Sequence, residues 1–599
     1  AKATYGRKGD DVVKKNWAAI DAGAKQVVEV QVPESWKNAE DEGLFMSHAS
    51  HGAQEAQDFV NNIQCKINAQ EGNSLPVSAF KDYVDGTTPS GTAAYEKRGI
   101  AVNVPVWVPD NCIQCNRCAY VCPHAAIRPV AMTADETANA PEGIKTLPLT
   151  GMKDYTFTMT VSALDCTGCG SCANVCPGKK GNKALEMAPL EANAGEQKYF
   201  DYGVTLPQKE DVIAKYKETT VKGSQFKQPL LEFSGACAGC GETPYAKLIT
   251  QLFGDRMYIA NATGCSSIWG NSSPSTPYTT NAKGQGPAWS NSLFEDNAEF
   301  GYGMLLAQRA IRGGLKEKIE DLVANGTNED VKAAGQEWLD TYAVGATNGA
   351  ATEKLVAALE ACGCDKAKEI LAQKDFLSKK SQWIFGGDGW AYDIGFGGVD
   401  HVLASGRDIN VMVFDTEVYS NTGGQSSKST PTGAIAQFAA GGKETKKKDM
   451  ASIAMSYGYV YVAQISMGAD FNQTVKAIAE AEAYPGPSLI IAYAPCINHG
   501  IKKGMSKAQT EEELAVKCGY WHNFRFNPAA ENKFSLDSKT PDMENYMDFL
   551  NGEVRYNSLQ RQNPEKAARL FAKNESEAQA RYEYLQKLIT LYGADKKED

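Results

Sequence analysis

The sequence predicts an α/β protein, in which a doubly wound parallel sheet is joined to a smaller inserted α+β domain. Two apolar runs, residues 383–385 and 409–414, have the composition of buried strands. A helix pattern from about residue 392 to 404 separates them, so the three segments form one βαβ unit. The second domain is indicated by regularly spaced cysteines between residues 104 and 208.

Length and composition narrow the class of protein. The 599 residues suggest roughly four domains, and 43% hydrophobic with 22% charged residues is an ordinary globular composition. A net charge of −11 argues against a nucleic-acid surface. An acidic electron carrier would therefore need a local basic patch. No apolar run approaches membrane-spanning length, and residues 1–5 contain no signal-peptide core.

The cysteines and the N-terminal segment add two expectations. The chain has sixteen cysteines, most of them in CxxC-type groups, and no secretion signal, which favours metal thiolates in a cytoplasmic protein over disulfides. Residues 1–52 hold one helix pattern, at 10–24, and one strand pattern, at 27–32, which cannot enclose a core. We expect the tail of an incomplete α/β domain there, and a linking segment at 53–95. The chain is thus expected to be a fragment or to need another polypeptide.

The strongest pattern lies in the expected domain at residues 96–210. Four cysteines at two-, two- and three-residue gaps precede a proline, and the whole run occurs twice, as bacterial [4Fe–4S] ferredoxins have it. In that pattern three thiolates hold one cluster and the fourth reaches the other. Two zinc sites are the alternative, although these usually pair CxxC units across a spacer. The expected ligand sets are Cys112, Cys115, Cys118 and Cys176 for one cluster, and Cys166, Cys169, Cys172 and Cys122 for the other.

The expected domain at residues 211–530 contains a turn suited to a phosphate. Gly387 and Gly389 let the backbone approach an oxyanion, the following helix presents free N–H groups, and Asp388 could hold Mg²⁺. The alternative is a glycine turn that only lets a helix pack on the sheet. A second polar loop after the next strand, beginning at Thr416, favours a magnesium–diphosphate site.

Two cysteines also follow strand patterns of this domain. Cys265 and Cys496 come after apolar runs, so they share one edge of the parallel sheet with Asp388 and Thr416. The pair Cys237 and Cys240 could close a four-thiolate site with them. A thioredoxin-like redox pair is the alternative, but no matching strand pattern precedes it.

Other segments carry weaker expectations. Residues 269–300 are expected to form an active-site loop, and residues 303–380 to be mostly helical. The charged run at 444–449 is expected to be a solvated loop, with docking of an electron carrier as the alternative. His499 is expected to be a hydrogen-bonded structural residue. Residues 531–599 are expected to form a helical C-terminal extension.

Several motifs resemble the pyruvate:ferredoxin (flavodoxin) oxidoreductases, specifically the C-terminal half of their single-chain form. They are CAGCGETPY from Cys237, ATGCSSIWG from Ala262, GDGW from Gly387, TEVYSNTGG from Thr416 and YAPCINHG from Tyr493. GDG with a second polar loop resembles the thiamine-diphosphate (TPP) motif, with Thr416 where most TPP enzymes have Asn. The resemblance implies a TPP-binding sheet domain with an inserted two-cluster ferredoxin-like domain.

The resemblance also implies ligands and a reaction. Mg²⁺ would be bound by Asp388, the Thr416 hydroxyl and the Val418 carbonyl. The implied reaction is oxidative decarboxylation of pyruvate to acetyl-CoA and CO₂, with electrons passing from TPP through three clusters to ferredoxin or flavodoxin. A third [4Fe–4S] cluster would be bound by Cys237, Cys240, Cys265 and Cys496. The implied cofactor-binding residues are Glu242, Cys265, Gly387, Asp388, Gly389, Trp390, Thr416, Glu417, Val418, Tyr419, Ser420 and Asn421, with Asn421 as the catalytic residue.

Partners and alternatives complete the expectations. The family's N-terminal half, with pyrimidine-binding and CoA-associated domains, would be needed for activity, and a homodimer is expected. No nucleic-acid or membrane partner is expected. The alternatives are a 2-oxoglutarate or indolepyruvate oxidoreductase, or an electron-transfer subunit without TPP.

Overall fold

The structure is a computed structural model that describes residues 1–38, 49–50, 52–272 and 275–593. The chain divides into two units, Ala1–Ser47 and His48–Asp599. The first unit contains α1 (Lys2–Tyr5) and α2 (Asp10–Lys25), so the predicted helix is confirmed. The strand predicted at 27–32 is wrong. These residues form no strand, and Val27, Val28, Val30 and Val32 are 62–78% exposed. A strand needs a neighbour for its backbone hydrogen bonds, and no described segment supplies one.

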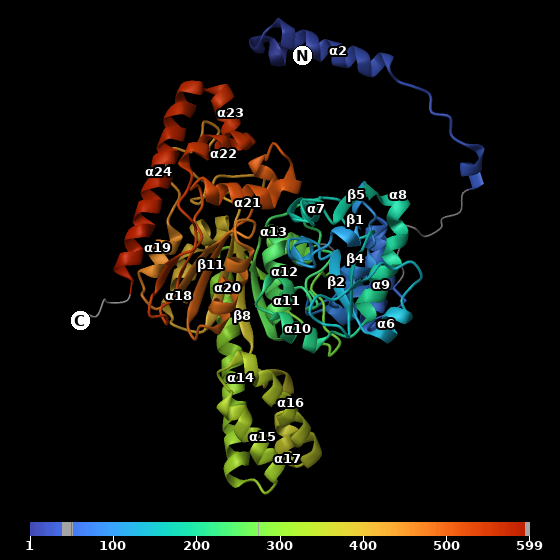
Figure 1. Ribbon diagram of the computed structural model, residues 1–599, viewed down its shortest axis with the longest axis vertical. Coiled ribbons are helices and arrows are strands. Elements are labelled where there is room, and N and C mark those ends of the chain that lie inside the picture. Colours follow the sequence, from blue (N-terminus) through green and yellow to red (C-terminus); the bar gives the residue numbers. More distant parts are fainter. Residues whose placement is uncertain (39–48, 51, 273–274, 594–599) are drawn as a thin grey trace. The chain divides into compact units, whose positions relative to one another are not determined.

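A mixed eight-stranded sheet forms the centre of the second unit (Figure 1). Its order is β13-β12-β10-β11-β9-β8-β6-β7. The six strands from β10 to β7 in that order are parallel, whereas β12 and β13 add an antiparallel edge. The predicted parallel sheet is thus confirmed. The strands are β6 (Met257–Ala262), β7 (Ala288–Ser292), β8 (Ser381–Gly387), β9 (Ile409–Asp415), β10 (Tyr461–Ile465), β11 (Pro487–Tyr493), β12 (Phe524–Phe526) and β13 (Phe534–Leu536).

Both faces of this sheet are buried. Side chains such as Ile384 and Val411 pack with α14 (Asn297–Asn325), α18 (Phe396–Ala404) and α19 (Met450–Met455). Phe385 and Phe414 point to the other face, where α12 (Thr243–Phe253) and α20 (Phe471–Ala483) cover them. Burial on both faces explains why these strands are continuous apolar runs in the sequence.

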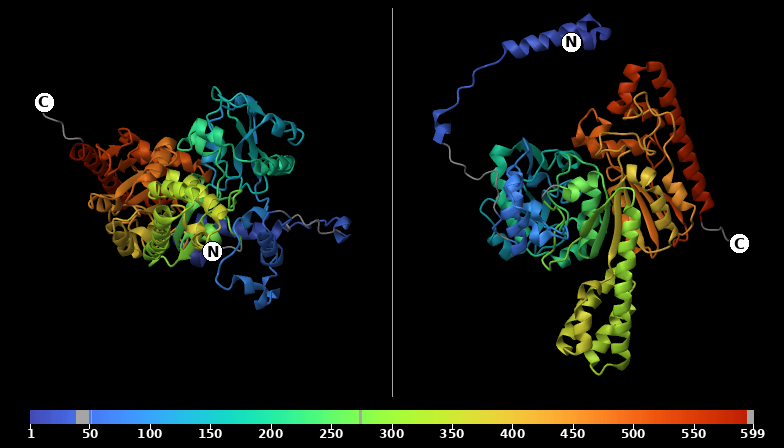
Figure 2. Two further views of the ribbon diagram at one scale, coloured as in Figure 1. Left: turned by 90° about the horizontal axis from the view of Figure 1, so that it is seen from below. Right: turned by 180° about the vertical axis from the view of Figure 1, so that it is seen from behind.

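The ferredoxin-like part lies beside this sheet in both views of Figure 2. β1 (Asn103–Trp107) pairs with β5 (Leu185–Pro189), and a second small sheet has the order β2-β4-β3. The strand predicted at 155–161 is confirmed as β4. Two short helices carry the third cysteine of each run. The remaining elements here are β2 (Ile127–Met132), β3 (Leu147–Pro148), β4 (Thr156–Val161), α5 (Arg117–Tyr120), α7 (Ser171–Val175) and α9 (Gln197–Thr205).

Helices account for most of the remaining chain. α14 continues from the sheet into an arm with α15 (Glu329–Asp340), α16 (Gly345–Cys362) and α17 (Asp365–Leu371) (Figure 1). This arm has its own core around Trp338, which confirms the helical prediction for 303–380. The C-terminal helices are α21 (Ala508–Lys517), α22 (Tyr546–Gly552), α23 (Val554–Gln562) and α24 (Pro564–Leu591), and α24 packs into the main core. Among the described helices, none has the length and apolar composition needed to cross a bilayer.

One expected loop is partly wrong. Residues 269–300 include β7, which pairs in parallel with β6, and the first turn of α14. The polar sequence of this edge strand, AWSNS, lacks the apolar run by which the inner strands were recognised.

Candidate cofactor and cluster site

Four neighbouring strands of the sheet end at the candidate site. β11, β9, β8 and β6 are adjacent and parallel. They are followed by Cys496, Thr416, Asp388 and Cys265, respectively. The expected common edge is therefore present, and it is the edge at which open α/β sheets bind ligands.

The Asp388 carboxylate is the centre of the first cluster of groups. Its Oδ1 accepts hydrogen bonds from the Thr416 backbone N–H at 3.2 Å and the Thr416 hydroxyl at 3.0 Å. Its Oδ2 accepts from the Ser427 hydroxyl at 2.6 Å. The Thr416 hydroxyl also lies 2.9 Å from the Val418 carbonyl oxygen. The structure thus brings together the three oxygen groups expected to bind Mg²⁺, and it adds Ser427.

The electrostatics of Asp388 suit a cation. Burial raises its pKa to about 8, and the neighbouring Asp415 adds to the effect. A bound divalent ion would stabilise the charged carboxylate and so offset the effects of burial and of Asp415. Because all three converging groups offer oxygen, the donor set fits Mg²⁺.

The glycine turn has open space beside Gly387 but is closely packed at Gly389. A Cβ on Gly387 would meet only the Phe414 carbonyl oxygen, at 3.9 Å, so the backbone there is accessible to a ligand. A Cβ on Gly389 would lie 2.4 Å from the Tyr419 ring. Gly389 is therefore required by the packing of the second loop on the first. Trp390, the next residue, is buried.

Glu417 is buried and held by cations. Its carboxylate lies 2.9 Å from Lys447 and 2.8 Å from Arg555, and it accepts from the Tyr520 hydroxyl at 2.5 Å. Burial would raise its pKa, but Lys447 and Arg555 outweigh burial and lower the pKa to about 2. Its φ of +59° places it in the left-handed region. Glu417 therefore fixes the shape of the loop through ion pairs.

The solvated loop expected at 444–449 is wrong at its centre. Lys447 reaches inward and also pairs with Asp415 at 2.8 Å. Two buried carboxylates at the end of β9 need compensating charge, and Lys447 supplies it. The charged residues were visible in the sequence, but their pairing across about 30 positions was not.

His499 supports the second loop, as expected of a structural histidine. Its Nε2 donates to the Thr416 carbonyl oxygen at 2.7 Å, and its side chain is fully buried. Burial lowers its pKa to about 3, so the ring is neutral near pH 7.

The second loop also contacts the cysteines. The Cys265 Sγ lies 3.1 Å from the Ser420 hydroxyl. Asn498 donates to the Ser420 carbonyl oxygen at 3.2 Å, and its side-chain nitrogen lies 3.6 Å from the Cys496 Sγ. The loop that contains Thr416 and Val418 is thus in direct contact with a cysteine and linked by Asn498 to another.

The four cysteines expected to hold a third cluster influence one another. Burial raises the pKa of the Cys496 thiol to about 11, and Glu242 and Cys237 add to the effect. Burial also raises the thiol pKa values of Cys240 and Cys265, and Cys496 contributes to both. Glu242 accepts from the Trp269 indole at 2.8 Å, and burial raises its pKa to about 7.

The ferredoxin-type cysteines surround two separate cavities. Backbone N–H groups point at their sulfurs, as at Gln114 to Cys112 (3.4 Å), Gly168 to Cys166 (3.3 Å) and Ala184 to Cys176 (3.3 Å). Hydrogen bonds to the sulfurs are a feature of iron–sulfur sites. Within the described ranges, no three His, Cys, Asp or Glu side chains are placed to hold a single metal ion. Cys112, Cys115, Cys118 and Cys176 line one cavity, and Cys122, Cys166, Cys169 and Cys172 line the other, which are the two expected sets.

Family models match three parts of the chain. Residues 341–492 match the thiamine pyrophosphate enzyme, C-terminal TPP binding domain. Residues 111–181 match the 4Fe-4S dicluster domain, and residues 47–101 match EKR, a domain of unknown function.

Longer relatives match almost the whole chain. The pyruvate-flavodoxin oxidoreductase of Enterobacter agglomerans is 55% identical over 598 residues, covering 98% of this chain and 50% of the relative. The pyruvate:ferredoxin oxidoreductase of Moorella thermoacetica is 54% identical over 599 residues, with the same two coverages. The pyruvate-flavodoxin oxidoreductase of Klebsiella pneumoniae is 52% identical over 591 residues, covering 98% of this chain and 49% of the relative.

Over 98% of its length the chain is thus similar to pyruvate-flavodoxin and pyruvate:ferredoxin oxidoreductases. It spans about half the length of these curated relatives. The TPP-binding domain contains Asp388, Thr416 and Val418, and the dicluster domain contains all eight ferredoxin-type cysteines. Cys265 and Cys496 lie outside both matched ranges, so the contact geometry is what supports them.

Asn421 is placed less favourably than its neighbours in the second loop. It is exposed, outside the group formed by Asp388, Thr416 and Val418. Its expected catalytic role stays a prediction.

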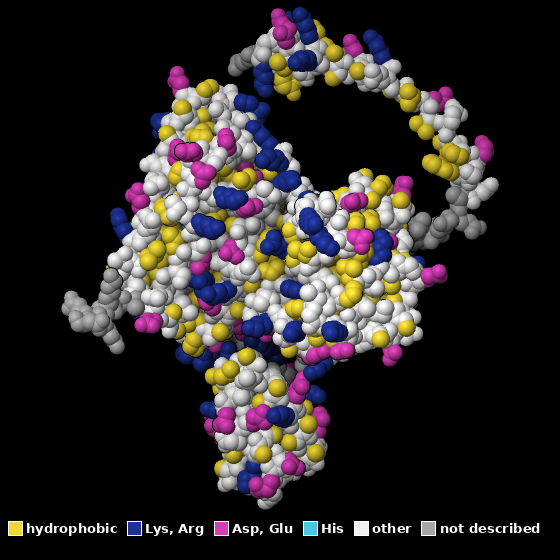
Figure 3. Space-filling view, viewed as in Figure 1, with side chains coloured by type: hydrophobic (Ala, Val, Ile, Leu, Met, Phe, Trp, Pro, Cys, Tyr) yellow, Lys and Arg dark blue, Asp and Glu magenta, His cyan; other side chains and the backbone are white. Residues whose placement is uncertain are grey.

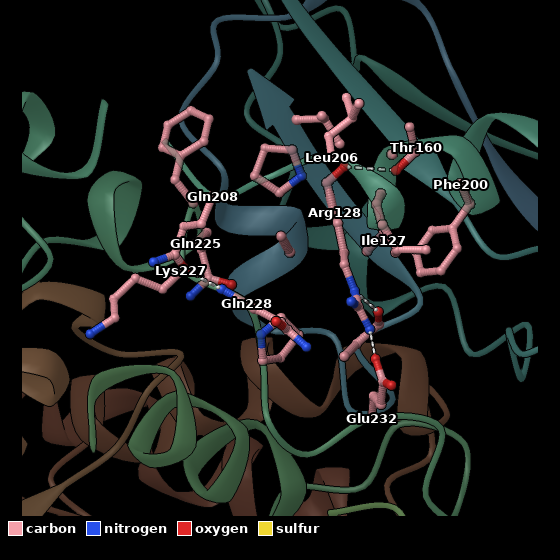
Figure 4. Close-up of a pocket in the computed structure, with 18 of the residues that line it drawn as sticks. Ile127, Arg128, Thr160, Phe200, Leu206, Gln208, Gln225, Lys227, Gln228 and Glu232 are labelled. Atoms are coloured by element: carbon pink, nitrogen blue, oxygen red, sulfur yellow. Dashed lines mark hydrogen bonds and ion pairs between the residues drawn. The ribbon is translucent and has the colours of Figure 1, made fainter. Parts of the chain in front are cut away.

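A further cavity was not foreseen from the sequence. It has about 460 Å³ and lies between β2, α9 and the segment before α12 (Figure 4). Arg128 crosses it to pair with Glu232, and the Thr160 hydroxyl donates to the Arg128 carbonyl oxygen at 3.2 Å. Asp388 and the second loop take no part in its lining.

Proposed function

We propose that this chain supplies the thiamine-diphosphate site and the electron-transfer clusters of a pyruvate oxidoreductase. In the overall reaction, pyruvate and CoA give acetyl-CoA, CO₂, one proton and two electrons. The electrons leave one at a time to ferredoxin or flavodoxin. The identity to pyruvate oxidoreductases over 98% of the chain supports this substrate over 2-oxoglutarate or indolepyruvate.

The observation that carries the proposal is the contact between the cofactor loop and the cysteines. Ser420, four residues after Thr416, touches Cys265 at 3.1 Å. Asn498 then joins Ser420 to Cys496. A magnesium–diphosphate loop and a thiolate site in contact give electrons a short path from one to the other. An electron-transfer subunit without TPP would not require a buried Asp388 carboxylate with the Thr416 hydroxyl and the Val418 carbonyl beside it.

Each group of residues has a distinct task in this proposal. Asp388, the Thr416 hydroxyl and the Val418 carbonyl hold Mg²⁺, while Gly387 leaves room for the diphosphate. When bound, TPP supplies the carbanion chemistry that releases CO₂ from a 2-oxo acid. His499, Lys447 and Arg555 keep the second loop rigid. The third cluster is held by Cys237, Cys240, Cys265 and Cys496.

A path from this site to the ferredoxin-type clusters is also present. The backbone N–H of Gly239, between Cys237 and Cys240, faces the Cys169 thiol and lowers its pKa, although burial raises that pKa more. Cys118 and Cys172 lie within electrostatic reach of each other across the two cavities. These interactions support an order in which the proposed third cluster is followed by the cluster of the Cys166 set and then by that of the Cys112 set.

The proposed partners follow from the family and from charge. The remaining half of the relatives' length is proposed to supply the pyrimidine-binding and CoA-associated domains, in a cytoplasmic homodimer. Lys/Arg and Asp/Glu side chains are interspersed on the face that Figure 3 shows. With a net charge of −11, docking of ferredoxin or flavodoxin then depends on a local basic patch.

Substitution of Asp388 tests the proposal. In the assembled enzyme, Asp388→Ala is expected to abolish Mg²⁺-dependent TPP binding and pyruvate oxidation while leaving the iron content unchanged. Asp400→Ala is the matched control, because Asp400 lies on α18 of the same βαβ unit and its carboxylate accepts a hydrogen bond from the Tyr457 hydroxyl at 2.8 Å, away from Asp388. Unchanged TPP binding and turnover in Asp388→Ala would reject the proposed site.

A further inference from the structure

Lys247 is a cation buried in the protein interior. It lies on α12, the helix that starts just after Cys240 and Glu242, and it is 1% exposed. Among the described residues no carboxylate forms an ion pair with it. Its Nζ instead donates to the carbonyl oxygens of Ala119 and Tyr120, the latter at 3.0 Å. A buried ammonium without a counter-charge is costly, so its position calls for negative charge nearby.

The two carbonyl groups lie at the junction of the two ferredoxin-type sites. Ala119 and Tyr120 end α5, between Cys118 and Cys122. Cys118 lines one cavity and Cys122 lines the other. Both thiols act on the Lys247 ammonium electrostatically, although burial is the larger effect on its pKa and lowers it to about 8.

We propose that Lys247 is an electrostatic positioning residue that raises the reduction potentials of both ferredoxin-type clusters. The inference rests on the proposed ligand sets. A [4Fe–4S] cluster with four thiolates is an anion, and its reduction adds one electron to the same site. A fixed cation in a low-dielectric interior stabilises the reduced cluster more than the oxidised one. Net charge around a cluster is one of the factors that set its potential.

Burial distinguishes Lys247 from the other lysines near these sites. Lys222 is half-buried, lies 3.9 Å over the Tyr216 ring and is close to Cys112 and Cys115, which belong to a single set. Lys180 follows Cys176 by four residues but is exposed. Water and salt screen such a charge strongly. Lys247 combines near-complete burial with a position between the two sets.

A redox titration of the cluster-loaded protein tests the inference. Lys247→Met removes the charge and keeps a similar side-chain length. At a fixed potential, with dithionite as reductant, the ratio of reduced to oxidised cluster should fall about tenfold for both ferredoxin-type clusters, which corresponds to 59 mV for a one-electron couple. Electron paramagnetic resonance follows the reduced clusters. Lys180→Met, the exposed control, should leave both potentials unchanged.

Iron and sulfide content shows whether a variant has lost its clusters or has kept them with changed or unchanged potentials. Lys247→Gln, which keeps one donor toward the carbonyl groups, serves if Lys247→Met does not fold. A full complement of iron with unchanged potentials would overturn the inference. Loss of clusters from both variants would assign Lys247 a purely structural role and overturn it as well. Absence of the two clusters from the parent protein would instead reject the proposed ligand sets.

Discussion

Asp388 is the residue whose protonation should control cofactor binding. Burial and Asp415 raise its pKa to about 8, so near pH 7 the carboxyl holds a proton that a cation must displace. The affinity for Mg²⁺ and TPP is therefore expected to rise about tenfold per pH unit below that pKa and to level off above it. Calorimetry in buffers of different ionisation enthalpy would count the released protons between about pH 6 and pH 9.

Ser427 provides the control for this titration. Its hydroxyl donates to Asp388 at 2.6 Å and thereby lowers the carboxyl pKa. Ser427→Ala should move the levelling-off point to higher pH, whereas the titration of the TPP diphosphate itself stays the same. An affinity that does not depend on pH, with no proton released, would contradict the assignment of Asp388.

Single residues also show how far sequence reasoning reached at the site. Asp388 and Thr416 were predictable because each ends an apolar strand, and adjacent parallel strands bring their ends together. Ser427 was missed because it approaches Asp388 from 39 positions downstream, through a segment without helix or strand periodicity. Lys447 was placed wrongly because its burial depends on Asp415 and Glu417, which only the folded chain brings near.

At the scale of elements, the β8–α18 turn and the second loop fit each other through Gly389. A Cβ there would lie 2.4 Å from the Tyr419 ring. Gly389→Ala should therefore displace the loop, weaken TPP binding and cost about 1–3 kcal/mol of unfolding free energy. Denaturant unfolding and TPP titration measure the two effects.

Gly397 offers a matched control within the same βαβ unit. It is an exposed residue of α18, and a Cβ there would meet nothing within 4 Å. Gly397→Ala should be neutral or stabilise the protein by about 0.5–1 kcal/mol, since alanine favours the helix. Equal behaviour of the two variants would show that the Tyr419 contact does not shape the loop.

Which elements were predictable depends on what each one buries. The inner strands are covered on both faces, so their apolar runs identified them. β7 is an edge strand of polar composition and was taken for a loop. The strand expected at 27–32 has the right composition but no neighbour within the described residues. Composition alone does not supply a hydrogen-bonding partner.

At the scale of the whole molecule, the chain contains one parallel sheet domain and one ferredoxin-like part, yet it spans about half of its relatives. The likeness to pyruvate oxidoreductases and the fold class could be predicted because short motifs mark the strand ends and the expected cluster ligands. The boundaries proposed near residues 52, 95, 210 and 530 stay a proposal, because residues 48–599 form one compact unit without a visible division.

The expected number of clusters and the expected failure of this chain to oxidise pyruvate by itself can both be tested. Three cubane clusters correspond to about twelve iron atoms per chain. Cys496→Ser should lower the count to about eight, because it removes a ligand of the proposed third cluster alone. Cys362→Ser, in the helical arm with a separate core, should keep all twelve.

The 599 residues by themselves should load clusters but not reduce methyl viologen with pyruvate, since the proposed pyrimidine-binding and CoA-associated domains belong to the other half of the relatives' length. Sustained pyruvate-dependent reduction by this chain, or an iron count near eight in the parent protein, would contradict the proposed division of labour or the third cluster, respectively.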